Sequence, residues 1–217
     1  MKVSNARLGI GLPLSHHMIP SAFFDSFIGM QKPPFVYLRT SNGPIEEMRN
    51  SLVRDAMVSN CTHLLLCDTD QVYPVDTVTK LLAHKLDVVG CLIFRRYPPF
   101  DPLLFKGELG KYQTIEEWEP GSLQEVDATG TGCLLFDMQV FRDMPAPWFR
   151  TRKFNGRPVG EDIGFCSDLK AAGYKIFVDT SIQAPHLSQI QITEATWRRY
   201  KKWEAEMAVE HGVMSHK

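Results

Sequence analysis

The sequence predicts an α/β protein built on a mostly parallel, Rossmann-like sheet flanked by helices. Through residue 94, apolar segments of strand length alternate three times with segments of helical periodicity. A strand, a helix and a second strand in succession favour parallel neighbours joined by right-handed crossovers. The 217 residues are 44% hydrophobic, so we expect a single globular domain with a substantial core.

The first half of the chain contains the clearest elements. Turn residues and a proline precede the segment 45–59, whose apolar residues recur at helical spacing. The strands expected here are 8–13, 35–39, 62–67 and 87–94. The helices expected between them are 21–28, 45–59 and 75–84.

Proline and glycine residues interrupt the pattern after residue 94. Residues 95–111 are expected to form a loop that could cover a site, and 112–119 with 123–128 a small hairpin. The remaining expected elements are a strand at 133–136, a helix at 139–142, a Pro/Trp-rich loop to 158, a helix at 160–172, a strand at 174–178 and a helix at 193–210. We therefore divide the chain into a domain at 1–192 and a C-terminal amphipathic helix and tail at 193–217.

Composition excludes several classes of protein. The N-terminus has no apolar core of a signal peptide, and no apolar run approaches the ~18 residues of a transmembrane helix. A net charge of −1 gives no reason to expect nucleic-acid binding. The five cysteines are odd in number and scattered, which indicates buried thiols in a reducing, cytoplasmic setting.

Asp68 and Asp70 follow the apolar strand 62–67 directly. Ligands of open α/β sheets bind just outside the carboxyl ends of the strands. In extended backbone, residues i and i+2 point the same way, so the two carboxylates can converge on a hard divalent cation. The alternative is ordinary turn and cap chemistry, in which Asp70 closes the strand before the helix near Pro74.

Three further motifs follow in order, namely Gly130-Thr131-Gly132, Glu161-Asp162 and His186. With Asp68-Thr69-Asp70, this set resembles the GT-A-type glycosyltransferases, particularly the family-2-like group. Met48-Arg49-Asn50 also resembles the Ala-Arg-Asn of that group. The resemblance spans roughly residues 7 to 190, and it would place the hairpin on the acceptor side of the site.

The resemblance implies a role for each motif. Asp70 and His186 would bind Mn²⁺ or Mg²⁺. Asp68 would contact either a metal-bound water or the ribose of the donor. The nucleotide sugar would be bound by residues from all the motifs, which are Arg49, Asn50, Asp68, Gly130, Gly132 and Glu161. Asp162 would be the general base that accepts the proton of the acceptor hydroxyl.

Each motif also has a purely structural interpretation. The two glycines fit a tight turn, His186 fits a loop histidine, and Glu161 with Asp162 fits a helix start. The same helix terminus is expected to lower the pKa of Asp162, which would weaken it as a base.

These motifs predict a metal-dependent glycosyltransferase that moves a sugar from a nucleotide-diphosphate sugar to a hydroxyl acceptor. One alternative is a sugar-phosphate nucleotidyltransferase, although the segment 9–15 has no basic residue to hold a triphosphate. Another alternative is a non-catalytic carbohydrate-binding or scaffold protein on the same fold.

The C-terminal helix at 193–210 has an apolar stripe of Trp197, Tyr200, Trp203 and Met207 flanked by basic residues. The stripe could dock on an anionic membrane surface. We favour packing on the catalytic domain instead, because the stripe is short and the acidic end of the helix would repel anionic lipid.

Overall fold

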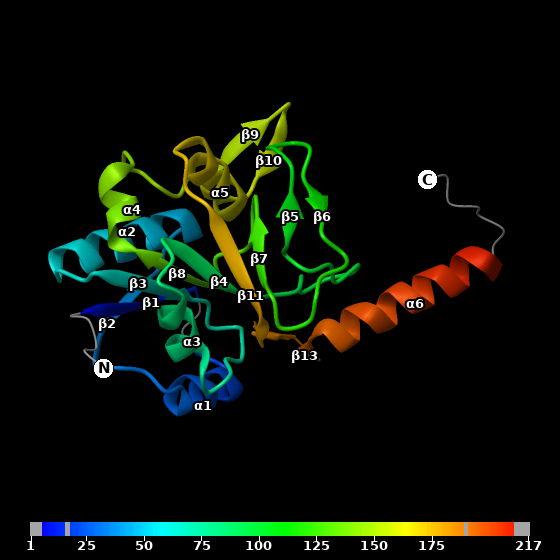
Figure 1. Cartoon of the computed structure of the whole chain (residues 1–217), viewed down its shortest axis with the longest axis horizontal. Helices are drawn as coiled ribbons and strands as arrows, with labels where there is room; N and C mark the ends of the chain where they lie inside the picture. Colours follow the sequence, from blue (N-terminus) through cyan, green and yellow to red (C-terminus); the bar gives the residue numbers. More distant parts are fainter. Residues whose placement is uncertain (1–5, 16–17, 189–190, 211–217) are drawn as a thin grey trace.

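The computed structural model describes residues 6–15, 18–188 and 191–210. Its centre is a seven-stranded sheet with helices on both faces (Figure 1). The strands lie in the order β2-β1-β3-β8-β4-β11-β7. They are β1 (Leu8–Leu14), β2 (Phe35–Ser41), β3 (His63–Cys67), β4 (Val88–Leu92), β7 (Leu123–Val126), β8 (Cys133–Asp137) and β11 (Ile176–Gln183).

The sheet is mostly parallel, as predicted. Strand β1 pairs in parallel with β2 and β3, and β4 pairs in parallel with β11. Only β8 and β7 run in the opposite direction, β8 between β3 and β4, and β7 at the edge beside β11. The reversal of β8 brings its start next to the end of β3, where Cys67 lies opposite Cys133 in the register of the two strands. The loop before β8 therefore lies beside the residues that follow β3.

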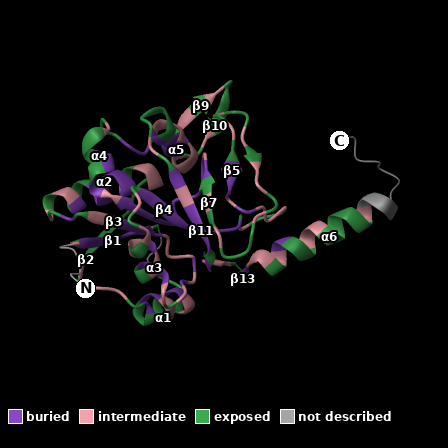
Figure 2. Ribbon diagram, viewed as in Figure 1, coloured by how far each residue is buried: buried purple, intermediate pink, exposed green. Residues whose placement is uncertain are grey.

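Helices cover the sheet with a separate core on each face. One face carries α2 (Ile45–Val58), α4 (Met138–Asp143) and α5 (Glu161–Ala171), and the other carries α1 (Ser21–Gly29) and α3 (Thr77–His84). Figure 2 shows the central strands of the sheet as largely buried, whereas the edge strands β2 and β7 are more exposed. Burial on both faces explains why β3 and β4 are continuous apolar runs in the sequence.

The predicted hairpin between residues 112–119 and 123–128 is wrong. Strand β6 (Gln113–Thr114) pairs with β5 (Phe105–Lys106), which lies inside the predicted loop, and β7 joins the main sheet. Residues 177–179 of β11 pair with β4 on one side and offer their other edge to β7. Sequence periodicity finds strands but does not say which strands pair.

A second hairpin lies within the predicted Pro/Trp-rich loop. Strands β9 (Arg152–Phe154) and β10 (Arg157–Val159) pair antiparallel around Asn155 and Gly156. Both turn residues have positive φ, 49° and 77°. Asn-Gly is the preferred pair for this type of two-residue turn, so the sequence did contain the signal.

Helix α6 (Glu194–Glu210) begins after β12 (His186–Leu187) and β13 (Gln191–Ile192) and extends away from the sheet (Figure 1). Trp197 at its base is 4% exposed and lies 5.9 Å, ring to ring, from Phe94 and from Trp118. Tyr200 packs edge-on against Phe100, whereas Trp203 is 53% exposed. The predicted packing therefore applies to the first turns of α6, and the predicted tail at 211–217 lies outside the described residues.

No helix in the described part of the chain is both long enough and apolar enough to cross a bilayer.

Candidate functional site

A cleft of about 400 Å³ opens where β1 and β3 end and α5 begins. Five residues singled out from the sequence line it, which are Arg49, Asp68, Asp70, Glu161 and Asp162. They come from α2, from the segment after β3 and from the first turn of α5. The fold therefore brings together side chains that lie more than a hundred residues apart in the sequence.

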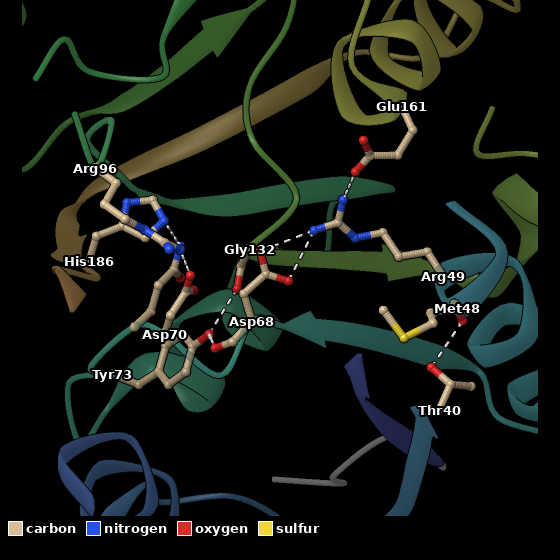
Figure 3. Close-up of polar contacts among 11 residues, drawn as sticks. Thr40, Met48, Arg49, Asp68, Asp70, Tyr73, Arg96, Gly132, Glu161 and His186 are labelled. Carbon is tan, nitrogen blue, oxygen red and sulfur yellow. Dashed lines mark hydrogen bonds and ion pairs between the residues drawn. The ribbon is translucent and has the colours of Figure 1, made fainter. Parts of the chain in front are cut away.

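Arg49 connects two of these carboxylates. Its Nη2 donates to both carboxylate oxygens of Asp68 at 3.0 Å, and its Nη1 forms an ion pair with Glu161 (Figure 3). Burial alone would lower the pKa of Arg49, but the neighbouring carboxylates raise the pKa above its ordinary value. The guanidinium is thus a permanent positive charge at the wall of the cleft.

Both acids at the start of α5 have a pKa above that of an ordinary carboxyl. Burial raises the pKa of Asp162 and the pKa of Glu161, although Arg49 opposes both shifts. The predicted lowering of the pKa of Asp162 by the helix terminus is therefore wrong. The amide of Ile163 donates to Asp162 Oδ1 at 2.7 Å, but that bond is weaker than the effect of burial.

Asp70 lies on the other side of the site from Arg49. Strand β3 ends at Cys67, and the chain then turns, so Asp68 and Asp70 are not in extended backbone. Asp68 is paired with Arg49, whereas Asp70 Oδ2 is paired with Arg96, which also lines the cleft. Asp70 Oδ1 is buried and has no hydrogen-bond partner among the described residues. The two carboxylates face different arginines in this structure, not a shared point.

His186 is brought to Asp70 by backbone pairing. The amide of Leu187 donates to the carbonyl of Asp70 at 2.6 Å, and the backbones of Gln71 and His186 form an isolated antiparallel β-bridge. His186 Nδ1 lies 2.5 Å from the carbonyl oxygen of Phe94 and must donate to it. Burial lowers the pKa of His186, so Nε2 keeps its lone pair and accepts from Gln71 Nε2 at 3.2 Å.

Both donors are suitable ligands for a divalent cation. The carboxylate oxygen of Asp70 suits Mg²⁺ or Mn²⁺, and the neutral imidazole nitrogen of His186 is a common ligand of transition metals. In the described residues, no three His, Cys, Asp or Glu side chains are grouped closely enough to hold a metal ion. A cation bound to His186 Nε2 would displace Gln71 from that nitrogen, and a cation bound to Asp70 Oδ1 would lie on the same carboxylate as the guanidinium of Arg96.

The two predicted glycines are buried and are not among the residues that line the cleft. A side chain at Gly132 would meet Gln71 Nε2 at 2.4 Å and Asp68 Oδ2 at 3.0 Å. The carbonyl of Gly132 also accepts from the amide of Asp68 and from the hydroxyl of Tyr73, both at 2.8 Å. Gly130 packs against Leu103. Gly132 thus allows Asp68 and Gln71 to take their places, which is a positioning role.

Asn50 does not line the cleft. Its Nδ2 donates to the carbonyl of Phe149 at 2.7 Å, and its Oδ1 accepts from the amides of Trp148 and Phe149 at 3.0 and 3.1 Å. The side chain is buried, with both ends of its amide bonded to one loop. In this structure Asn50 fixes that loop.

Sequence reasoning missed two residues that are close to the site. Arg96 follows β4, and Gln71 follows the aspartate pair. Both lie just beyond strands that end at the cleft, so the rule that identified Asp68 and Asp70 could also have identified them. The sequence predicts the segment 95–111 only as a covering loop, so Arg95 and Arg96 are not among the predicted site residues.

Solved structures share this fold. A197 from STIV superposes with a TM-score of 0.58 at 17% identity, over 84% of this chain and 86% of that one. GalNAc-T7, solved with UDP, GalNAc and Mn²⁺, gives 0.60 at 9% identity, over 91% of this chain and 48% of that one. Residues 1–349 of S. aureus TarS, in complex with UDP-GlcNAc, give 0.52 at 14% identity, over 82% of this chain and 58% of that one.

The GT-A-type fold expected from the motifs is therefore confirmed by structures that include glycosyltransferases. The chain spans about half the length of the GalNAc-T7 and TarS chains. No protein-family model and no sequence of a curated protein matches it.

Proposed function

We propose that this protein is a metal-dependent glycosyltransferase that moves a sugar from a nucleotide-diphosphate sugar to a hydroxyl acceptor. The observation that carries the proposal is the cleft itself. It gathers Arg49, Asp68, Asp70 and Asp162 at the carboxyl ends of the strands of a fold shared with GalNAc-T7 and TarS. Those two proteins were solved with UDP and with UDP-GlcNAc, which supports a nucleotide-sugar donor here.

The donor diphosphate would lie near the segment after β3. Asp70 and His186 would hold Mn²⁺ or Mg²⁺, and Asp68 would contact the ribose or a metal-bound water. A divalent cation at this place supplies Lewis acidity that neutralises charge on a leaving diphosphate. The Mn²⁺ in the GalNAc-T7 structure is consistent with such a cofactor. Arg49 and Glu161 would fix the orientation of Asp68, because Arg49 binds both carboxylates.

Asp162 is the proposed general base. It lines the cleft at the first turn of α5, and burial raises its pKa. A raised pKa makes a carboxylate a stronger proton acceptor at neutral pH than an ordinary aspartate. Gly160 leaves room for this carboxyl, since a side chain there would meet Asp162 Oδ1 at 2.7 Å. The acceptor hydroxyl would give its proton to Asp162 as it attacks the anomeric carbon.

A cytoplasmic location is part of the proposal. The five cysteines are all unpaired and buried in the structure. Free thiols without disulfides are typical of proteins in a reducing compartment.

The decisive experiment is a panel of nucleotide sugars incubated with the protein, once with Mn²⁺ and once with a chelator. We expect release of the nucleoside diphosphate from one or a few donors, only with metal, and faster when a sugar or alcohol acceptor is present. Calorimetry should show metal-dependent binding of the matching nucleoside diphosphate.

Two outcomes would contradict the proposal. Release of pyrophosphate from a nucleoside triphosphate and a sugar phosphate would identify a nucleotidyltransferase. Failure to bind any nucleotide, together with binding of a glycan, would indicate a carbohydrate-binding protein on this fold.

A further inference from the structure

The two arginines of the cleft differ in how firmly they are held. Arg49 is 5% exposed and binds two carboxylates, so its position is fixed. Arg96 is 35% exposed, and within the described residues its ion pair is with Asp70 alone (Figure 3). A partly exposed pair of this kind contributes little free energy and is readily exchanged. Arg96 is thus the cation of the cleft that can change partner.

The same carboxylate is a proposed metal ligand. Arg96 forms its ion pair with Asp70 Oδ2, while Asp70 Oδ1 is buried and has no partner in the part of the chain that the structure describes. A divalent cation bound to Asp70 would sit next to the guanidinium, and two positive charges at one carboxylate repel each other. The guanidinium and the metal therefore compete for Asp70.

We propose that Arg96 exchanges its partner when the donor binds. Without a divalent cation, Arg96 neutralises Asp70. When the cation binds Asp70, Arg96 turns to the sugar-linked phosphate of the donor diphosphate. This inference rests on the proposed function, because it assigns the diphosphate contact within the same site. No covalent bond changes in the exchange.

The chemistry of the residue supports this assignment. A guanidinium presents several N–H donors in a planar fork that matches the oxygens of a phosphate. Arg96 lines the same cleft as Asp68 and Asp70 and lies in the loop that follows β4. In the part of the chain that the structure describes, Arg49 is the other arginine that lines this cleft, and it is already bound to two carboxylates. Arg96 is the side chain left to meet a diphosphate.

The first test measures Mn²⁺ binding to the free protein by electron paramagnetic resonance, without nucleotide. Arg96→Gln removes the competing charge, so we expect the affinity for Mn²⁺ to rise about threefold to fivefold. The matched control is Arg95→Gln, the adjacent arginine, which is exposed and lies over the ring of Phe105. Arg95→Gln should leave the affinity for Mn²⁺ unchanged.

The second test compares nucleoside diphosphate with nucleoside monophosphate by calorimetry at saturating Mn²⁺. Arg96→Gln should weaken diphosphate binding roughly tenfold or more, because a charge-assisted hydrogen bond is lost. Monophosphate binding should change by less than about twofold, since its single phosphate is not the group contacted. Arg96→Lys keeps the charge without the fork, so it should retain wild-type Mn²⁺ affinity and lose part of the diphosphate preference.

The outcomes separate this inference from the proposed function. If the wild-type protein binds nucleoside diphosphate and Arg96→Gln changes neither the affinity for Mn²⁺ nor the diphosphate preference, partner exchange is wrong and the proposed function stands. If the wild-type protein binds no nucleotide but Arg96→Gln binds Mn²⁺ more tightly, the competition at Asp70 stands and the donor class is wrong.

Discussion

Arg49 donates from one nitrogen to both carboxylate oxygens of Asp68 at 3.0 Å, although the two residues lie 19 positions apart on α2 and after β3. The same guanidinium also binds Glu161 at the start of α5. One buried cation therefore joins three elements at the wall of the cleft. This arrangement has a consequence for stability as well as for substrate binding.

Replacing Arg49 with Met should destabilise the protein by about 3–5 kcal/mol, because two carboxylates would remain in the wall without their counter-charge. Urea unfolding followed by circular dichroism measures the loss. Arg54→Met is the matched control on the same helix, since Arg54 is exposed and bonds only to Ser51. Equal losses in the free energy of unfolding for the two variants would show that the Arg49 ion pairs do not stabilise the protein.

Asp162→Asn should lower kcat by about 10²- to 10⁴-fold while donor affinity stays within a few fold, because a general base acts mainly in the transition state. The acid limb of the kcat profile should lie above the pH range of an ordinary aspartate, since burial raises the pKa of Asp162. Asp55→Asn, an exposed aspartate on α2, is the control. If Asp162→Asn kept its turnover, Glu161 and Asp162 would have only a structural role at the start of α5.

Asp162→Asn should also raise Tm at neutral pH. Since burial raises the pKa of Asp162, the folded protein binds this proton more tightly than the unfolded chain does. The stabilisation that comes from binding this proton is fully present below the pKa of Asp162 in the unfolded chain, about 3.9. It is lost as the pH rises through the pKa of Asp162 in the folded protein. Thermal scans from acid to neutral pH should show the advantage of the variant growing with pH. A difference in Tm that is the same at every pH would contradict this account.

Asp70→Asn should abolish metal-dependent nucleotide binding and leave the fold intact, because it removes a ligand charge at a partly exposed position. His186→Ala should weaken the metal affinity less, on the order of tenfold, since water can replace a neutral ligand. Calorimetry with and without Mn²⁺ measures both effects. An unchanged Mn²⁺-dependent nucleotide affinity in Asp70→Asn would overturn the metal assignment.

Trp197→Ala should cost about 3–5 kcal/mol of stability, because it removes a buried ring from contact with Phe94 and Trp118. Trp203→Ala, further along α6 and 53% exposed, should change stability by less than about 0.5 kcal/mol. Chemical denaturation of both variants tests the pair. Loss of sedimentation with anionic vesicles in Trp203→Ala, at normal stability, would instead favour the membrane interpretation of this helix.

The sequence by itself predicted most of the strands of the main sheet and most of the helices that cover it. Continuous apolar runs identified β3 and β4 because both faces of these strands are buried, and helical spacing identified α2. The position of Asp68 and Asp70 after β3 was enough to place them at the carboxyl ends of the strands, where the cleft opens. These properties depend on local periodicity and on where a strand ends, which a sequence records directly.

Pairing and partner choice were decided only by the tertiary structure. Whether β7 joins β6 or β11 depends on which edge is open, and local periodicity carries no information about that edge. The pKa of Asp162 follows from how deeply α5 buries it, and this outweighs the helix terminus that the sequence suggested. Likewise, Asp70 lies against Arg96 because separate strands end at one cleft. Long-range electrostatics and burial come from elements packed together, so only the folded chain sets them.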